Sequence, residues 1–192
     1  DSAFRPLERG LAALVVTDLS RVRQLRIVER ARLQALLDEL QLAESGRVDL
    51  ATGARSGRLV RASEVVQGQF FVGPTSQLRM DATMVRATDA EVTATGSSAD
   101  QLQAMFDIEK AVVFQLLAKL GITLTPAERL AISERPTRDI QAFLLYSRGL
   151  ETMDGGDFAA AAGFFGAAAR LDPGFGAAAQ QAAASQAAQA AS

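Results

Sequence analysis

Apolar and polar positions change their period twice along this chain of 192 residues. Up to about residue 62 the apolar residues recur every three or four positions, which is typical of amphipathic helices. From there to Gly96 they alternate with polar residues, as in strands, and afterwards the helical spacing returns. The pattern predicts helices at 6–19, 30–42, 49–62 and 101–120, and strands at 25–29, 64–72, 77–87 and 91–96.

Local signals at the ends of these segments support the prediction. Pro6 and Glu8 suit the first turn of a helix, and Asp49 and Asp100 are placed to cap the helices that follow them. Gly121 is placed to stop the helix at 101–120. Two short turns, at 73–76 and 88–90, join the last three strands into a meander.

The order of elements predicts an α/β (α+β) fold, with a small mixed sheet of about four strands flanked by helices. A strand such as 25–29 usually has a parallel neighbour, yet the first predicted helix begins at residue 6 with no strand before it. We therefore expect that a first strand is missing upstream of Asp1, or that something else supplies it.

The stretch 142–178 carries the strongest local signal in the chain. Two helical patterns flank a turn at 155–157, the second ends at Leu171-Asp172-Pro173, and small residues stand where the two helices must touch. The spacing resembles one tetratricopeptide repeat, a helical hairpin of about 34 residues that binds proteins. The residues predicted to contact a protein partner are Tyr146, Leu150, Met153, Phe164 and Phe175.

A single repeat is too small to bury its core alone, because such units are stabilised by stacking. These side chains therefore have an alternative role, which is to pack against the preceding domain or the C-terminal helix. The predicted organisation is a domain at 1–121, a linker at 122–138 with one helical turn at 127–132, the helix pair at 139–175, and an Ala/Gln-rich helix or tail at 176–192.

Composition narrows the classes of function. The chain has no His and no Cys, which removes Cys nucleophiles, His bases, disulfides and the usual zinc sites. A net charge of −2 gives no general attraction to nucleic acid. No apolar run is long enough to span a bilayer as a helix, and we expect that any signal or lipid anchor lies outside this chain.

Several segments of the N-terminal part resemble one protein family. They are the stretches 10–20 (GLAALVVTDLS), 25–30 (LRIVER), 33–40 and 62–70 (ASEVVQGQF), and the resemblance extends over about 7–120. It is a resemblance to the CsgG-like superfamily, which includes the curli export channel, lipoprotein activators of penicillin-binding proteins, and domains like the N-terminal part of the Tol-Pal propeller protein. Members usually begin with a strand that this chain lacks.

The resemblance implies a non-enzymatic role in the cell envelope, as a pore or as a protein that contacts a cell-wall enzyme. A membrane-crossing strand needs about 9–11 residues with an outward apolar face. The strand at 77–87 instead carries Arg79, Asp81 and Arg86, which argues against a pore.

For the remaining candidate sites, a structural role explains the residues better than catalysis or ligand binding. Asp107 and Glu109 lie about 200° apart around a helix and do not converge, so we expect Glu109 and Lys110 at the surface. The glycines of 46–57 lack the ending of a phosphate-binding loop. A cluster of basic residues consists of Arg21, Arg23, Arg26, Arg30 and Arg32. It could bind an anionic partner, or it could be a solvated rim whose arginines pair with nearby acidic residues, and we favour the rim.

The sequence as a whole predicts a periplasmic or membrane-associated envelope protein that is not an enzyme. We expect an adaptor or accessory subunit with protein partners in a larger complex, without cofactor, metal or nucleic acid, and a homo-oligomer is compatible with this. The alternatives are a structural subunit built permanently into a membrane complex for secretion, cell-wall synthesis or photosynthesis, and a component of a secretion channel.

Overall fold

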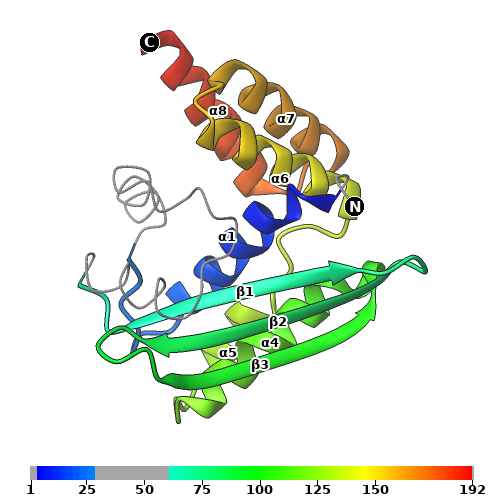
Figure 1. Cartoon of the computed structure of the whole chain (residues 1–192). Helices are drawn as coiled ribbons and strands as arrows, with labels where there is room; N and C mark the ends of the chain where they lie inside the picture. The colour runs from blue at the N-terminus through cyan, green and yellow to red at the C-terminus, as the bar shows by residue number, and fades with distance from the viewer. Residues whose placement is uncertain (1–3, 29–60, 192) are drawn as a thin grey trace. The chain divides into compact units, whose positions relative to one another are not determined.

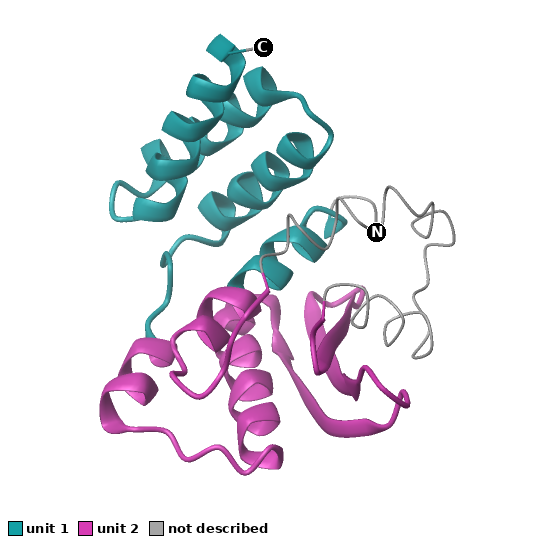
Figure 2. Ribbon diagram, turned by 90° about the vertical axis from the view of Figure 1, so that its left-hand side faces the viewer, with its two compact units in different colours: residues 1–14, 134–192 teal, residues 15–133 magenta. Residues whose placement is uncertain are grey.

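The structure is a computed structural model that describes residues 4–28 and 61–191. Its contacts divide the chain into two compact units, which Figure 2 shows in different colours. Unit 1 combines Asp1–Leu14 with Glu134–Ser192, and unit 2 is Val15–Ser133. Helix α1 (Leu7–Ser20) confirms the first predicted helix and contributes residues to both units. The predicted helices at 30–42 and 49–62 lie almost wholly outside the described residues.

Unit 2 contains the predicted meander (Figure 1). Strands β1 (Glu64–Val72), β2 (Gln77–Arg86) and β3 (Val92–Gln101) pair in this order, and both pairs are antiparallel. The register places Gly68 opposite Ala82 and Ala82 opposite Gly96. The alternating pattern predicted β1 and β2 to within one residue, whereas β3 was predicted at 91–96 and continues to Gln101.

The α/β (α+β) fold class is confirmed, but the sheet differs from the prediction in one strand. Residues 25–28 of the predicted strand 25–29 form no strand, so the sheet has three antiparallel strands instead of a mixed set of about four. Leu25 N–H donates to the Val22 carbonyl at 3.0 Å, which is a turn bond. The physical reason is that a strand exists only through a hydrogen-bonded neighbour, and no described strand runs beside this segment.

Helix α4 (Met105–Lys119) covers β3 and, to a lesser extent, β2. The inward residues of β2 are buried against this layer: Leu78, Met80, Ala82 and Met84. The sheet and the helix approach each other closely at Gly96, where an added Cβ would lie 2.9 Å from the Val112 carbonyl oxygen. Gly96 is thus the position on β3 that lets α4 sit directly on the sheet.

The ends of α4 follow the predicted signals only in part. Asp100 does not cap the helix, because β3 continues to Gln101 and a 3₁₀ turn (η3, Leu102–Ala104) intervenes. Leu102 N–H donates to the Ser76 carbonyl at 2.8 Å, which keeps the chain in the sheet up to this point. At the other end Gly121 has φ +70° and terminates the helix as expected.

The predicted linker holds a short helix, α5 (Pro126–Ser133), in place of one helical turn. Thr125 and Glu128 form a reciprocal cap: Glu128 N–H donates to the Thr125 hydroxyl at 3.2 Å, and Thr125 N–H donates to the Glu128 carboxylate at 2.8 Å. The other oxygen of this carboxylate accepts a bond from Arg23 N–H at 2.9 Å. These backbone donors lower the pKa of Glu128, with Arg23 N–H the largest cause.

Unit 1 contains three C-terminal helices: α6 (Ile140–Asp154), α7 (Phe158–Leu171) and α8 (Gly176–Ala191). The predicted helical hairpin is confirmed as α6 and α7, and the Ala/Gln-rich end is a helix that packs on α7. Asp139 caps α6 through bonds from Gln141 N–H and Ala142 N–H, and Asp157 caps α7. The assignment to the tetratricopeptide class and the predicted domain bounds stay predictions.

Candidate functional site

The outer edge of β1 is the feature of unit 2 that most resembles a docking site. Ser63 and Gly73 flank this strand, and both are bonded to the β2 side: Ala87 N–H to the Ser63 carbonyl and Gly73 N–H to the Gln77 carbonyl, each at 2.8 Å. Because backbone groups alternate in direction, odd-numbered residues of β1 bond to β2 and even-numbered residues point their N–H and C=O groups outward. We call this row the open edge; it consists of Val66, Gly68, Phe70 and Val72.

No group within residues 4–28 and 61–191 is hydrogen-bonded to the outward N–H and C=O groups of Val66, Gly68 and Phe70. The side chains of β1 are also incompletely covered. None of its residues is buried, whereas five residues of β2 are, and Phe71 is 65% exposed. An edge with free backbone groups and half-exposed apolar side chains is a template for pairing with another strand.

The outer edge of β3 is different, because α4 occupies it. Gln115 of α4 accepts a bond from Ser97 N–H at 3.0 Å and donates its amide to the Ser97 carbonyl at 3.1 Å. At the end of the strand, Gln101 N–H donates to the Asp100 carboxylate at 2.7 Å. We call this the covered edge, since side chains bond to both backbone groups of Ser97 and to the N–H group of Gln101.

The face of the sheet opposite α4 carries a row of polar side chains. Asp81 on β2 accepts two bonds of 2.9 Å from the Arg79 guanidinium and one of 2.6 Å from the Ser97 hydroxyl on β3. These bonds, with Arg79 the first cause, lower the pKa of the Asp81 carboxyl. Arg79 is therefore held by a neighbour in its own sheet and does not present a free positive charge to a ligand.

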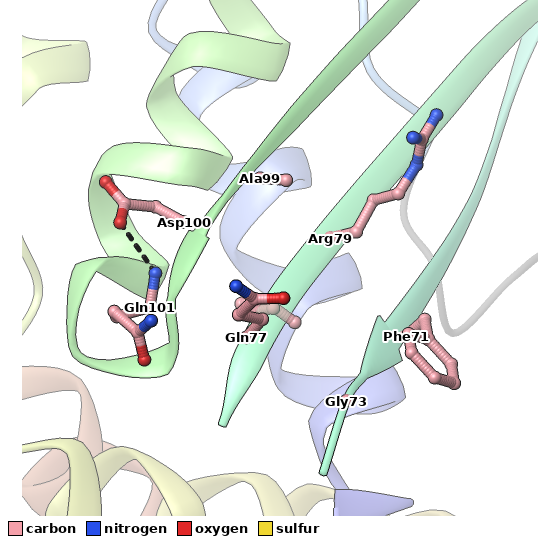
Figure 3. A pocket seen from close by; sticks show the side chains of 8 residues that line it. Phe71, Gly73, Gln77, Arg79, Ala99, Asp100 and Gln101 are labelled. Atoms are coloured by element: carbon pink, nitrogen blue, oxygen red, sulfur yellow. Dashed lines mark hydrogen bonds between the residues drawn. The ribbon is translucent and has the colours of Figure 1, made fainter. Parts of the chain in front are cut away.

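A shallow cavity of about 490 Å³ lies at one end of this polar face (Figure 3). It is lined by Phe71, Gly73, Gln77, Leu78, Arg79, Ala99, Asp100 and Gln101. In Figure 3, Phe71 projects from β1 away from the other labelled side chains. The lining holds two titratable side chains, Arg79 and Asp100, and Arg79 is bonded to Asp81, so the cavity offers a contact surface beside the open edge.

The five predicted interaction residues lie in unit 1, and the structure packs most of their surface inside it. Leu150 forms a core cluster with Ala161 and Phe165, and Phe175 is fully buried, with its ring 4.9 Å from that of Tyr146. Tyr146 and Met153 pack against the same cluster, and Phe164 is half-buried. A role in binding a partner stays a prediction for them.

The neighbour that a single helical hairpin needs comes from both ends of the chain. Ala182 of α8 and Ala13 of α1 pack against the Leu150 cluster. The first half of α1 approaches α6 closely, since a Cβ on Gly10 would lie 2.0 Å from the Ser147 hydroxyl. The alternative explanation of packing within the chain is thus consistent with the geometry.

A buried charged cluster was missed by sequence reasoning. Glu109 and Lys110 were expected at the surface, but Glu109 is 0% and Lys110 6% exposed. The Lys110 ammonium donates a short hydrogen bond to Asp18 of α1 and lies 3.1 Å from a Glu109 carboxylate oxygen. The expectation was wrong because helix periodicity gives the relative directions of two side chains around the helix axis. It does not show which side of the helix is buried against another element. The sequence did contain a signal of burial: Glu109 has apolar residues three and four positions away on both sides.

The electrostatics of this cluster follow from its burial. Burial raises the pKa of Glu109 to about 8; the neighbouring Asp18 charge adds to the shift, while Lys110 opposes it. Burial also raises the pKa of Asp18 against the opposing effect of Lys110. Despite the short distance to Lys110, neither Glu109 oxygen has a well-formed hydrogen bond within the described residues. With side chains 8% or less exposed, the cluster is closed to a substrate and serves to join α1 to α4.

The other candidates identified from the sequence give no site. Arg21 lies 3.9 Å from Asp18, and the remaining described members of the basic cluster, Arg23 and Arg26, are exposed. Arg30, Arg32 and the glycines of 46–57 lie outside the described residues. The part of the chain that the structure describes holds no group of three His, Cys, Asp or Glu residues that could bind a metal ion, and none of its helices is long and apolar enough to cross a membrane.

Comparison with protein families agrees with the resemblance of the N-terminal segments. The family model described as "Curli production assembly/transport component CsgG" matches residues 2–72, which include α1 and the open edge of β1. Comparisons with curated proteins and with solved structures found no match. The resemblance expected for 73–120 stays a prediction. The chain therefore carries a CsgG-like domain, with the family match spanning residues 2–72.

Proposed function

We propose that this chain is a non-enzymatic protein of the cell envelope that acts as a protein–protein interaction adaptor or accessory subunit. The single observation that carries the proposal is the open edge of β1, which lies inside the segment that matches the CsgG family. That family is described as an assembly and transport component, and this favours a role in docking over a role in chemistry.

The helical unit supports the same proposal. Helices α6 and α7 resemble a tetratricopeptide hairpin, and Leu171 at the end of α7 remains 51% exposed. A docking protein of this kind would use two surfaces, the open edge on unit 2 and the exposed sides of the helices on unit 1. We place it in the periplasm or on the membrane at the envelope, with protein partners and without cofactor.

The test is affinity capture of the tagged chain from fractionated cells, followed by mass spectrometry. We expect the chain and its reproducible partners in the envelope fraction, and we expect Leu171→Glu to reduce recovery of partners that contact the helices. The matched control is Leu130→Glu, because Leu130 of α5 is also strongly exposed, at 69%, but lies in unit 2. Recovery of cytosolic proteins alone would overturn the envelope assignment.

The second candidate is a structural subunit that is permanently built into a membrane complex. The half-exposed apolar residues on both faces of β1 favour it, because obligate interfaces are more apolar than transient ones. Purification of the chain alone separates the two functions. A folded soluble chain supports the adaptor, whereas a chain that is insoluble without partners supports the permanent subunit.

A further inference from the structure

The order of residue types along β1 is symmetric about Gly68. On either side of this glycine come one glutamine and then two apolar residues, so that the strand reads Val65-Val66-Gln67-Gly68-Gln69-Phe70-Phe71. Such a pattern matches itself when the strand is turned end for end. The open edge has the same property, because Val66 and Phe70 present their outward backbone groups at equal distances from Gly68.

We propose that the open edge binds the open edge of a second copy of this chain, antiparallel about a two-fold axis through Gly68. The inference rests on the proposed role of the open edge as a docking surface and names its partner. Two three-stranded sheets would become one continuous sheet of six strands, with the outward N–H and C=O groups of one copy bonded to those of the other.

Between residues 65 and 71, each side chain in this register meets one of its own kind, whereas Glu64 at the end of the strand lies opposite Val72. Val66 pairs with Phe70 on the side of α4, Val65 pairs with Phe71 on the polar face, and Gln67 pairs with Gln69. No residue from 65 to 72 is charged, so no like charges meet across the axis. Half-exposed apolar groups become covered, and Phe71, now 65% exposed, gains an apolar neighbour.

Other registers and other occupants fit less well. A shift by one residue brings Gln67 opposite Phe70 and places the α4 layers of the two copies on opposite sides of the sheet. At the covered edge of β3 a second strand would first have to displace Gln115 from both backbone groups of Ser97. A strand from another protein would satisfy the backbone equally, but nothing requires such a strand to repeat the symmetric pattern of β1.

A single cysteine tests both the partner and the register, because the chain has no cysteine of its own. Only Gly68 lies opposite itself, at a Cα separation of about 5.5 Å, which a disulfide can bridge. A Cβ is tolerated at Gly68, where its nearest neighbour would be the Asp81 carbonyl oxygen at 3.6 Å. We expect Gly68→Cys to form a covalent dimer as the main product under mild oxidation.

The matched controls are Gln67→Cys and Gln69→Cys, each one residue from the axis. Their Cα atoms would lie diagonally, about 7–8 Å from the same atom of the other copy, which is beyond disulfide reach. We expect their dimer yield to be at least about tenfold lower than that of Gly68→Cys. Equal yields for all three variants, or none for any, would overturn the proposed register.

The second measurement is the mass of the full chain in solution by size-exclusion chromatography with light scattering. We expect twice the mass of one chain, and a single-chain mass for Gly68→Lys, which places two like charges on the axis. Ala99→Lys on the covered edge is the control and should leave the dimer intact. Circular dichroism checks that Gly68→Lys is folded.

The outcomes of this test are separate from those of the proposed function. A folded chain that is monomeric at every concentration overturns the self-pairing and leaves the capture of envelope partners to be judged by itself. A monomer whose open edge is protected from hydrogen exchange only after a partner is added would assign the edge to that partner instead. A dimer without envelope partners would support the inference and contradict the proposed function.

Discussion

The two edges of the three-stranded sheet differ in whether their outward backbone groups are hydrogen-bonded. At β3, Gln115 from α4 bonds to both backbone groups of Ser97, at 3.0 and 3.1 Å. At β1, no described residue bonds to the outward groups of Val66, Gly68 and Phe70. The comparison teaches that an edge is closed by what packs beside it and not by its own composition, since β3 itself contains no Lys or Pro.

The covered edge depends on α4 being held in place. Two interactions hold α4: the buried hydrogen bond from Lys110 to Asp18, and the close packing of Val112 against Gly96. Substitutions that remove each of these interactions test the role of α4, and a substitution at Phe71 tests the open edge. If the comparison is right, loss of α4 from β3 should turn a covered edge into a second open one.

The largest effect is expected for Lys110→Ala. Removal of one partner of a buried ion pair leaves Asp18 with the more distant Arg21, at 3.9 Å, and should cost about 3–5 kcal/mol of unfolding free energy. Urea denaturation followed by circular dichroism measures it. The double variant Asp18→Leu/Lys110→Met should recover most of the loss, and Lys119→Ala at the exposed end of α4 should change little. A loss below about 1 kcal/mol for Lys110→Ala would mean that the cluster does not anchor α4.

The second prediction concerns pH. The native state holds a proton on Glu109 up to about pH 8, whereas the unfolded chain releases it near pH 4.5. The unfolded state therefore binds fewer protons between these values, and stability falls as the pH rises through this window, by at most about 1.4 kcal/mol per pH unit. The raised pKa of Asp18 acts in the same direction.

Denaturation midpoints measured across this range test the prediction. Glu109→Gln should flatten the dependence, because an amide does not titrate, whereas Glu8→Gln on the exposed side of α1 should leave it unchanged. Stability that rises with pH between about 5 and 8 in the wild-type chain would contradict the assignment.

A smaller effect is expected for Gly96→Ala. Its Cβ would lie 2.9 Å from the Val112 carbonyl oxygen, so that α4 must move away from β3. Overpacking of this kind should cost about 1–3 kcal/mol. Gly163→Ala on α7 is the control, because a Cβ there meets nothing within 4 Å and should be neutral or stabilising. A Gly96→Ala variant as stable as the wild type would show that α4 does not pack closely against β3 at Gly96.

Gln115→Ala tests the covered edge directly. The substitution removes two exposed hydrogen bonds and should cost only about 1 kcal/mol. The clearer result is local: the amide of Ser97 should exchange with solvent faster, as we expect for Gly68 in a monomeric chain, while amides of β2 are unchanged. Hydrogen exchange followed by NMR measures this, and unchanged protection of Ser97 would mean that Gln115 does not cover the edge.

The smallest effect on stability is expected for Phe71→Ser. Phe71 is 65% exposed, so its removal should change the unfolding free energy by less than about 0.5 kcal/mol. The same change should weaken any association through the open edge. A large loss of stability would place Phe71 in the core of the single chain instead.

Much of the fold could be predicted from residue patterns, and the failures have a common cause. The alternation of 64–72 gave β1 to the residue, and the two helical patterns around the turn at 155–157 predicted α6 and α7. The predicted strand at 25–29 failed over its described part because pairing needs a partner that a local pattern does not show. The predicted cap at Asp100 failed because a distant bond, from Leu102 to Ser76, kept the chain in the sheet.

The candidate site was less predictable than the fold. The sequence indicated a meander and an appended helix pair, but it did not indicate which edge of the sheet is open. It also placed Glu109 and Lys110 at the surface, because nothing local marks Asp18, in a helix far away along the chain, as their neighbour. Side chains such as Leu150 and Phe175 were recognised as important and turned out to be packed within unit 1.

The sequence by itself therefore determined the local elements, the absence of His and Cys chemistry, and the symmetric pattern of β1, because these depend on residues close in the chain. Only the tertiary structure decided that α4 covers β3, that Lys110 is buried against Asp18, and that the outward groups of β1 stay unbonded within the described residues. The physical reason is that burial and hydrogen-bond satisfaction are set by what lies next to a residue in space, which residue spacing along one strand or helix does not specify.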